Sequence, residues 1–222
     1  MSAPQALLLD FGSVVSVSVF ERHRDTEAAL GLAPYSLSWH GALDPDTDPL
    51  WQSMQRDEIS EREYWAIRAR EVGKAVGEPL WDVNTFLRRT RQAEPEAVVR
   101  KEIRALIGAA RRKGILVGIL SNELELFYGA DFLRHMNIMN EFDAIVDASV
   151  TGILKPEPRA YALAIEALHL PASQILFVDD QHRNIVGAVK AGLQTQYFDL
   201  RDVSGNIEAL AARLRLTQGA LA

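Results

Sequence analysis

Two adjacent acidic residues, Asp179 and Asp180, follow a short apolar run in the stretch ILFVDDQHRNIVGA. Their carboxylates repel each other, and a hard divalent cation is one common way to offset that repulsion. Mg²⁺ prefers a few carboxylate oxygens together with water and phosphate. Capping of the following helix is the alternative role for one of the two side chains. Taken alone, the pair leaves both roles open.

Four more polar residues stand where apolar runs end or where a helix is about to begin. Asp10 ends the run ALLLD, Ser121 and Asn122 end ILVGILSN, and Lys155 precedes a proline in GILKPEPRAY. Singly, Asp10 and Ser121 suit turns or caps, and Lys155 suits a solvated loop. Together they form an ordered set along the chain: an acid, Ser-Asn, Lys-Pro and then the diacid. This order indicates one site assembled from four segments.

The elements that must position these residues are strands alternating with amphipathic helices. The predicted strands are 6–9, 116–120, 144–146, 175–178 and 194–198, and the predicted helices between and after them are 95–113, 159–168, 183–191 and 207–216. Continuous apolar strands alternating with helices predict an α/β fold, a Rossmann-like parallel sheet with helices on both faces. Ligands of such sheets bind beyond the carboxyl ends of the strands, which is where these polar residues stand.

The segment 16–93 differs from the rest because it contains no convincing buried strand. It holds all four tryptophans: Trp39, Trp51, Trp65 and Trp81. Ser60 followed by Glu63 is typical of a capping box, which predicts a helix start there. We therefore predict a Rossmann-like core domain of residues 1–15 and 94–222. A helical cap domain of residues 16–93 is predicted to follow the first strand.

Composition narrows the class of protein and its partners. The 222 residues carry a net charge of 24 − 30 = −6, which argues against a nucleic-acid partner. No run approaches the ~18 apolar residues of a membrane span, and no secretory signal is visible at the N-terminus. The chain contains no cysteine, which excludes disulfides and thiolate chemistry. We expect a cytoplasmic protein with a small-molecule partner, and both a monomer and a homodimer remain open.

The ordered motifs resemble those of the haloacid dehalogenase-like (HAD) hydrolase superfamily. The resemblance extends from Ala6 to about Gly192 and includes the position of the helical insertion. The stretches LSNELE, KPEPRAY and FVDDQHRNIVGA are similar to a sugar-phosphate phosphatase branch whose first motif reads Asp-Phe/Leu-Gly-Gly/Asn-Val. The resemblance implies a Mg²⁺-dependent phosphatase that hydrolyses a small phosphorylated metabolite, such as a sugar phosphate, through an aspartyl-phosphate.

The resemblance also implies a role for each motif residue. Asp10 would be the nucleophile, Lys155 would pair with Asp10 and the phosphoryl group, and Ser121 would complete the catalytic set. Substrate phosphate oxygens would be held by Ser121, the amide of Asn122 and Lys155. The implied metal ligands are Asp10, the backbone carbonyl of Gly12 and Asp180, with Asp179 beside it. Asn184 falls where the family often has a further carboxylate that orients the site.

Gly12 is the main departure from the family pattern. Most phosphatases of the superfamily have a second aspartate there, which protonates the leaving oxygen and then activates water. Such general acid–base help is typically worth ~10²–10⁴ in rate. Four side chains of the insertion are candidate replacements: His23, His40, Glu21 and Asp25. A glycine at this position would also allow a sharp backbone turn.

A glycine at position 12 is also compatible with a site that needs no replacement acid. The leaving group of the substrate could need little protonation, as in a sugar-1-phosphate. The protein could be a 2-haloacid dehalogenase, because a departing halide takes no proton; the diacid Asp179–Asp180 argues against this, since it would repel a haloacid carboxylate. The protein could also be an impaired, binding or regulatory relative, although Asp10, Ser121 and Lys155 are all retained.

Over the site, Trp39 could stack on a sugar ring, but core packing is the favoured role of the tryptophans.

Overall fold

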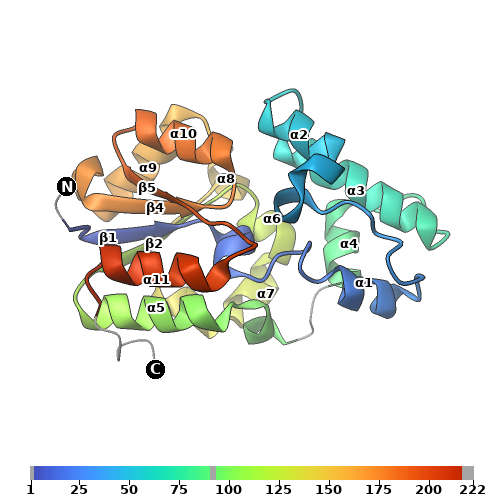
Figure 1. Ribbon diagram of the computed structural model, residues 1–222, viewed down its shortest axis with the longest axis horizontal. Coiled ribbons are helices and arrows are strands. Elements are labelled where there is room, and N and C mark those ends of the chain that lie inside the picture. The colour runs from blue at the N-terminus through green and yellow to red at the C-terminus, as the bar shows by residue number, and fades with distance from the viewer. Residues whose placement is uncertain (1–2, 91–93, 217–222) are drawn as a thin grey trace.

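Five parallel strands form one sheet in the order β3-β2-β1-β4-β5 (Figure 1). The structure is a computed structural model that describes residues 3–90 and 94–216. The strands are β1 (Ala6–Leu9), β2 (Leu116–Ser121), β3 (Ala144–Asp147), β4 (Ile175–Asp179) and β5 (Gln194–Tyr197). All five predicted strands are therefore confirmed to within one residue at each end.

The first strand of the chain lies at the centre of the sheet and is buried on both faces. Leu7 of β1 is in register with Val117 of β2 on one side and with Leu176 of β4 on the other. Leu7 and Leu9 point into one apolar cluster, whereas Leu8 points into the other. A strand buried on both faces needs consecutive apolar residues, which explains the run of three leucines before Asp10.

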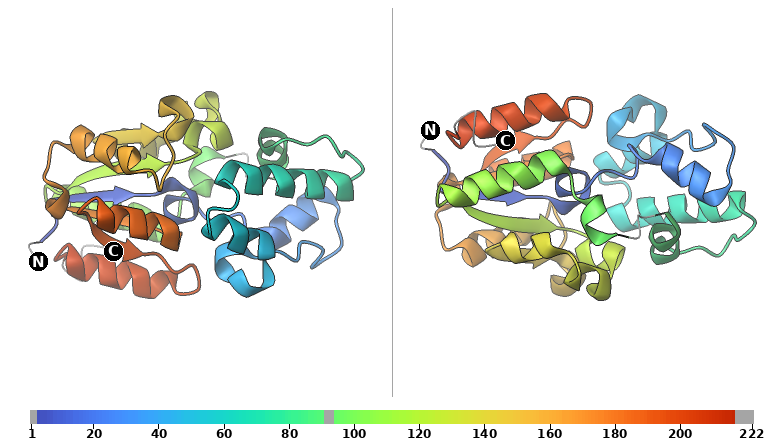
Figure 2. Two further views of the ribbon diagram at one scale, coloured as in Figure 1. Left: turned by 90° about the horizontal axis from the view of Figure 1, so that it is seen from above. Right: turned by 90° about the horizontal axis from the view of Figure 1, so that it is seen from below.

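Helices cover both faces of the sheet, as the views in Figures 1 and 2 show. The helices α5 (Lys101–Arg112) and α11 (Val203–Arg213) pack on the face that carries Leu7. The helices α9 (Pro158–Leu168) and α10 (His182–Lys190) pack on the opposite face. This arrangement confirms the Rossmann-like α/β fold. In the described parts of the chain, no helix has both the length and the apolar character needed to cross a membrane.

The predicted helix over 95–113 is wrong at its N-terminal end. Residues Pro95–Val98 form a separate 3₁₀ turn, and the α-helix begins only at Lys101. The residues between them are extended because they pair with the chain that leaves β1. Ser16 and Val99 form an antiparallel bridge, and the Arg100 N–H donates to the Val15 carbonyl at 2.8 Å. This tertiary pairing overrides the helical spacing of the apolar residues.

The segment inserted after β1 is helical and lies beyond the carboxyl ends of the strands (Figure 1). Its helices are α1 (His23–Leu30), α2 (Pro49–Gln55), α3 (Glu61–Ala75) and α4 (Val83–Thr90), and no strand occurs in its described part, 16–90. The predicted capping box is confirmed: Ser60 Oγ accepts from the Glu63 N–H, and the Glu63 carboxylate accepts from the Ser60 N–H. The division into a core and a cap domain stays a prediction.

Three short helices occupy the connections after β2 and β3: α6 (Leu124–Tyr128), α7 (Ala130–Arg134) and α8 (Ala148–Thr151). One apolar cluster runs from β1 through Phe11 into the insertion, where it includes all four tryptophans. The ring of Trp39 packs edge-on against His23, with 4.4 Å between the ring centroids. Trp39 thus packs in the core of the insertion, as favoured for the tryptophans, and it is absent from the lining of the pocket at the strand ends as far as that lining is described.

Candidate active site

The carboxyl ends of β1 and β4 bring the predicted nucleophile and the diacid together. Asp10 directly follows β1, and its N–H donates to the Val178 carbonyl of β4 at 2.9 Å. Asp179 is the last residue of β4, and Asp180 follows it. One carboxylate oxygen from each of Asp10, Asp179 and Asp180 lies within 4.8 Å of the others. Parallel pairing of the two strands thus builds a buried cluster of three acids.

Lys155 reaches this cluster from the loop before α9. Its Nζ lies 2.9 Å from Oδ1 of Asp10 and 2.7 Å from Oδ2 of Asp179. The Asn122 side chain holds the loop in place, because its Oδ1 accepts from the Lys155 N–H at 2.7 Å and its Nδ2 donates to the Lys155 carbonyl at 3.2 Å. The Ser-Asn and Lys-Pro motifs are therefore in direct contact, through the Asn122 side chain and the Lys155 backbone.

The charges of this cluster suit a divalent cation. Three carboxylates and one ammonium give a formal charge of −3 + 1 = −2 in a buried site, and hard oxygen ligands of this kind suit Mg²⁺. Asp10 and Asp180 line the pocket above the sheet, whereas Asp179 is fully buried beneath it. Asp10 and Asp180 are thus the carboxylates placed to hold a metal ion directly.

Asp179 is held by donors on all sides and is placed to orient its neighbours. Besides Lys155, it accepts from the Gln181 N–H at 2.8 Å and from Asn184 Nδ2 at 3.1 Å to each oxygen. Asn184 Oδ1 is buried and has no hydrogen-bond partner among the described residues. It is therefore an acceptor that a water of a metal's hydration shell could satisfy.

Burial dominates the electrostatics of the cluster. It raises the pKa of Asp10 to about 7; Lys155 opposes this effect, and Asp179 and Glu61 add to it. Burial, followed by the charges of Asp179 and Asp10, also raises the pKa of Asp180 well above its usual range. For Lys155, burial alone would lower the pKa, but Asp10 and Asp179 outweigh it and raise the pKa. A bound cation would stabilise the ionised carboxylates.

The segment Phe11–Val15 turns directly after Asp10, but the turn does not require a glycine at position 12. Gly12 has an ordinary φ of −62°, and the left-handed conformation falls on Ser13, with φ 64°. The expected turn is therefore present, but it does not depend on a glycine at position 12. A Cβ at position 12 would meet Asp10 Oδ2 at 3.9 Å, an ordinary contact. The missing side chain leaves open space beside the Asp10 carboxylate.

Ser121 and Asn122 are buried at the end of β2. With Asp10 and Gly12 they line a small hollow next to the acid cluster, and Glu61 of the insertion closes it from the other side. Ser121 Oγ accepts from the Glu123 N–H at a long 3.4 Å, so its hydroxyl proton can still be donated. The hollow therefore offers a hydroxyl donor directly beside the acid cluster.

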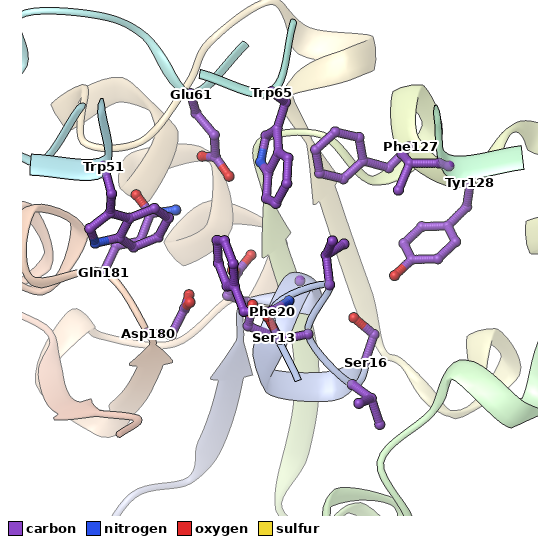
Figure 3. Close-up of a pocket in the computed structure, with 16 residues that line it drawn as sticks. Ser13, Ser16, Phe20, Trp51, Glu61, Trp65, Phe127, Tyr128, Asp180 and Gln181 are labelled. Carbon is purple, nitrogen blue, oxygen red and sulfur yellow. The ribbon is translucent and has the colours of Figure 1, made fainter. Parts of the chain in front are cut away.

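A larger pocket opens above the cluster, between the sheet and the insertion (Figure 3). It encloses about 480 Å³, including its open mouth. Its aromatic walls are Phe20, Trp51, Trp65, Phe127 and Tyr128. The charged side chains that line it in the described chain are Asp10, Glu61 and Asp180. The pocket therefore combines an acidic floor with aromatic walls.

The four candidate replacements for the missing acid lie away from this pocket, as far as its lining is described. Glu21 is bound to Arg100 at 2.6 Å, and Asp25 is exposed beside Arg22. His23 is buried in the insertion, with the His40 ring 5.6 Å away. Their expected role as an acid or base is therefore wrong. Glu61, which the sequence did not single out as an acid or base, is the acidic residue of the insertion that does line the pocket, and the capping box at Ser60 places it at a helix start.

His23 has a different consequence, which concerns stability. Neither ring nitrogen has a hydrogen-bond partner among the described residues. Burial lowers the pKa of His23 to about 4; His40 and Arg68 act in the same direction, and Glu27 and Asp48 act against them. The folded state therefore holds the neutral ring, while the unfolded chain binds a proton near pH 6.5.

We expect acid to destabilise the fold through His23. Since the unfolded state binds more protons between the two pKa values, stability falls as pH drops below about 6.5, by about 2 kcal/mol at pH 5. Urea unfolding of the wild type and of His23→Phe at pH 7.5 and pH 5 measures this. Other groups titrate equally in both proteins, so the variant should lose less stability than the wild type. Equal losses would contradict the expectation.

Comparisons with known proteins add the family relationship. A family model for haloacid dehalogenase-like hydrolases matches residues 19–192. Among curated proteins, the chain is 34% identical over 89 residues to mouse acyl-CoA dehydrogenase family member 10, covering 40% of this chain and 8% of that protein. It is 32% identical over 98 residues to phosphatase MT3486 of Mycobacterium tuberculosis, covering 44% and 45%. The matched part thus spans less than half of either relative.

Solved structures extend the likeness to almost the whole chain. The magnesium-bound crystal structure of YfnB from Bacillus subtilis superposes with a TM-score of 0.71 at 18% identity, covering 97% of this chain and 100% of that one. At this identity the likeness concerns the fold alone. The curated relatives include both phosphatases and 2-haloacid dehalogenases, so similarity alone does not choose between these two reactions.

Proposed function

The chain belongs to the haloacid dehalogenase-like hydrolase family, and we propose that it is a Mg²⁺-dependent phosphatase for small phosphate monoesters of the sugar-phosphate kind. The observation that carries the proposal is the buried contact of Lys155 with Asp10 and Asp179, beside Asp180. A carboxylate nucleophile approaches an anionic phosphate only where cations offset the repulsion. The ammonium is built in, and the acid cluster suits the divalent ion.

In the proposed reaction, Asp10 attacks phosphorus in line with the ester oxygen and forms an aspartyl-phosphate, which water then hydrolyses. Lys155 orients the nucleophile through its 2.9 Å contact with Oδ1 and faces the phosphoryl oxygens. The Ser121 hydroxyl and the Asn122 amide hold the non-transferring oxygens. Mg²⁺ held by Asp10, Asp180 and the Gly12 carbonyl would supply the remaining positive charge.

We further propose that residues 16–93 act as a cap domain over a core of residues 1–15 and 94–222. Polar contacts between the two support this. Arg183 of α10 binds Asp57 at 3.0 Å, and Arg62 of α3 binds Glu123 at 2.8 Å. A cap in this position excludes water during the reaction and contacts the part of the substrate beyond the phosphate.

A 2-haloacid dehalogenase is the alternative that the absence of an acidic side chain at Gly12 favours, because a departing halide takes no proton. The acidic lining of the pocket by Asp10, Glu61 and Asp180 argues against it, because without a metal ion these groups repel the carboxylate of a 2-haloacid, whereas Mg²⁺ would offset the same repulsion in the proposed phosphatase. A protein that only binds or regulates is disfavoured too. Such a protein gains nothing from three buried carboxylates around Lys155, which are costly to keep charged.

The deciding experiment is the release of inorganic phosphate from p-nitrophenyl phosphate and from a panel of sugar phosphates by the purified protein. We expect turnover with Mg²⁺ and its loss in excess EDTA, restored when Mg²⁺ is added back. Halide release from a 2-haloacid without metal would indicate the dehalogenase instead. Absence of both reactions would overturn the assignment as a hydrolase of either kind.

Asp180→Ala tests the metal site within the same assay. We expect the Mg²⁺ concentration for half-maximal activity to rise by more than about 100-fold, because even residues one step removed from a metal cost 10–100-fold. Asp131→Ala, which removes an exposed carboxylate, is the matched control and should leave the Mg²⁺ dependence unchanged. An Asp180→Ala protein with wild-type Mg²⁺ dependence would remove Asp180 from the metal site.

A further inference from the structure

Glu61 enters the active-site pocket from the insertion, opposite the acid cluster. It is the first residue of α3, and the capping box of Ser60 and Glu63 fixes the start of that helix. Its side chain lines both the larger pocket and the small hollow, in each case together with Asp10 and Gly12. Figure 3 shows its carboxylate directed from α3 into the pocket, toward the side where Asp180 and Ser13 lie.

The contacts of Glu61 hold the side chain but leave one oxygen available. Oε2 accepts from Asn122 Nδ2 at 2.9 Å and lies 3.8 Å from Arg183 Nη2. Both contacts involve the same oxygen, so within residues 3–90 and 94–216 Oε1 is the atom left for a molecule in the pocket. The side chain is 14% exposed, as expected for a group that faces an enclosed space.

The other acids near the pocket already have different tasks. Asp10 is the proposed nucleophile, Asp180 the proposed metal ligand, and Glu123 is buried in its pair with Arg62. Glu61 therefore lines the same two pockets as Asp10 and Gly12, where position 12 offers no side chain. We propose that Glu61 is the general acid and base of this enzyme, a role supplied from the insertion because Gly12 cannot supply it.

This assignment rests on the proposed phosphatase function, and its proton steps balance. As the Asp10 oxygen bonds to phosphorus and the ester P–O bond breaks, protonated Glu61 gives its proton to the departing oxygen, and the alcohol leaves. The Glu61 carboxylate then takes one proton from the water that attacks the aspartyl-phosphate. The P–O bond to Asp10 breaks with its electron pair returning to the carboxylate. Hydrogen phosphate leaves, and both residues regain their starting forms.

Glu61→Gln tests the proposal, because the amide keeps the shape and can still accept from Asn122 but cannot transfer the proton. With an alkyl phosphate we expect kcat to fall about 10²–10⁴-fold. With p-nitrophenyl phosphate, whose leaving group needs no proton, the variant should release one nitrophenol per enzyme in a rapid burst and then turn over slowly. Glu58→Gln, the same change at an exposed site of the insertion, should behave as wild type.

A second variant separates catalysis from structure. A Cβ at position 12 meets only ordinary contacts. Gly12→Asp added to Glu61→Gln should therefore raise kcat with the alkyl phosphate at least tenfold above that of Glu61→Gln alone. Alkyl phosphate turnover by Glu61→Gln within threefold of wild type overturns the role of Glu61. So does an equal loss on both substrates with no burst and no restoration. If wild type itself releases no phosphate with Mg²⁺, the phosphatase assignment fails first, and the role of Glu61 fails with it.

Discussion

Asp10→Asn is expected to lower kcat roughly 10⁴-fold or more, the scale seen when a nucleophile is removed from a catalytic unit, while leaving the protein folded. The amide has the shape of the carboxylate but does not attack phosphorus. The fold should persist because burial disfavours the charged form of Asp10, whose pKa is raised to about 7. Removing that charge in the absence of Mg²⁺ therefore relieves repulsion within the acid cluster.

Two measurements check this expectation. Phosphate release gives the activity, and thermal unfolding without Mg²⁺ should show a midpoint equal to or above that of the wild type. Asp25→Asn is the matched control, because Asp25 is an exposed acid of the insertion and should affect neither quantity. Retained turnover in Asp10→Asn would exclude an aspartyl-phosphate at Asp10. A large fall in stability would show that its charge supports the fold.

Lys155→Met should damage both stability and activity. The ammonium is 1% exposed and contacts Asp10 and Asp179, which are 10% and 0% exposed. Removing one partner of a buried ion pair costs about 3–5 kcal/mol, because the remaining charge has lost its counterion. Turnover should fall as well, since the nucleophile and the phosphoryl group lose the same cation. Urea unfolding and phosphate release measure the two losses.

A second substitution separates these losses. Adding Asp179→Asn to Lys155→Met removes an unpaired buried carboxylate, so part of the stability should return while activity stays low. Lys190→Met, at an exposed position of α10, is the control for the change itself. If Lys155→Met had the stability and the turnover of the wild type, the contacts of Lys155 would contribute neither to the stability of the fold nor to the reaction.

The sheet was predictable because its strands are buried on both faces and so carry an uninterrupted apolar signal, as LLL before Asp10 does. The helix over 95–113 could not be bounded correctly, because its first residues pair with Ser16 and Val15, which are distant in sequence. The spacing of apolar residues records only local periodicity. This spacing does not reveal pairing between segments that are distant in sequence.

The positions of the site residues followed from a general property of parallel sheets, in which strand ends meet at one edge. Asp10 and Asp180 could therefore be placed together from their sequence positions. Glu61 could not be placed, because the direction of a side chain from an inserted helix depends on how that helix packs. The turn after Asp10 was anticipated from Gly12, but the residue with positive φ in that turn is Ser13.

The central position of β1 also has a consequence for how the chain assembles. This strand is synthesised first, yet its two neighbours begin at Leu116 and Ile175. Its hydrogen bonds to β4 therefore wait until residues up to about 179 have been synthesised, and closing such long loops slows folding. The inserted helices, whose contacts are nearer in sequence, can become ordered earlier. We expect the catalytic edge of the sheet to be among the last parts to form.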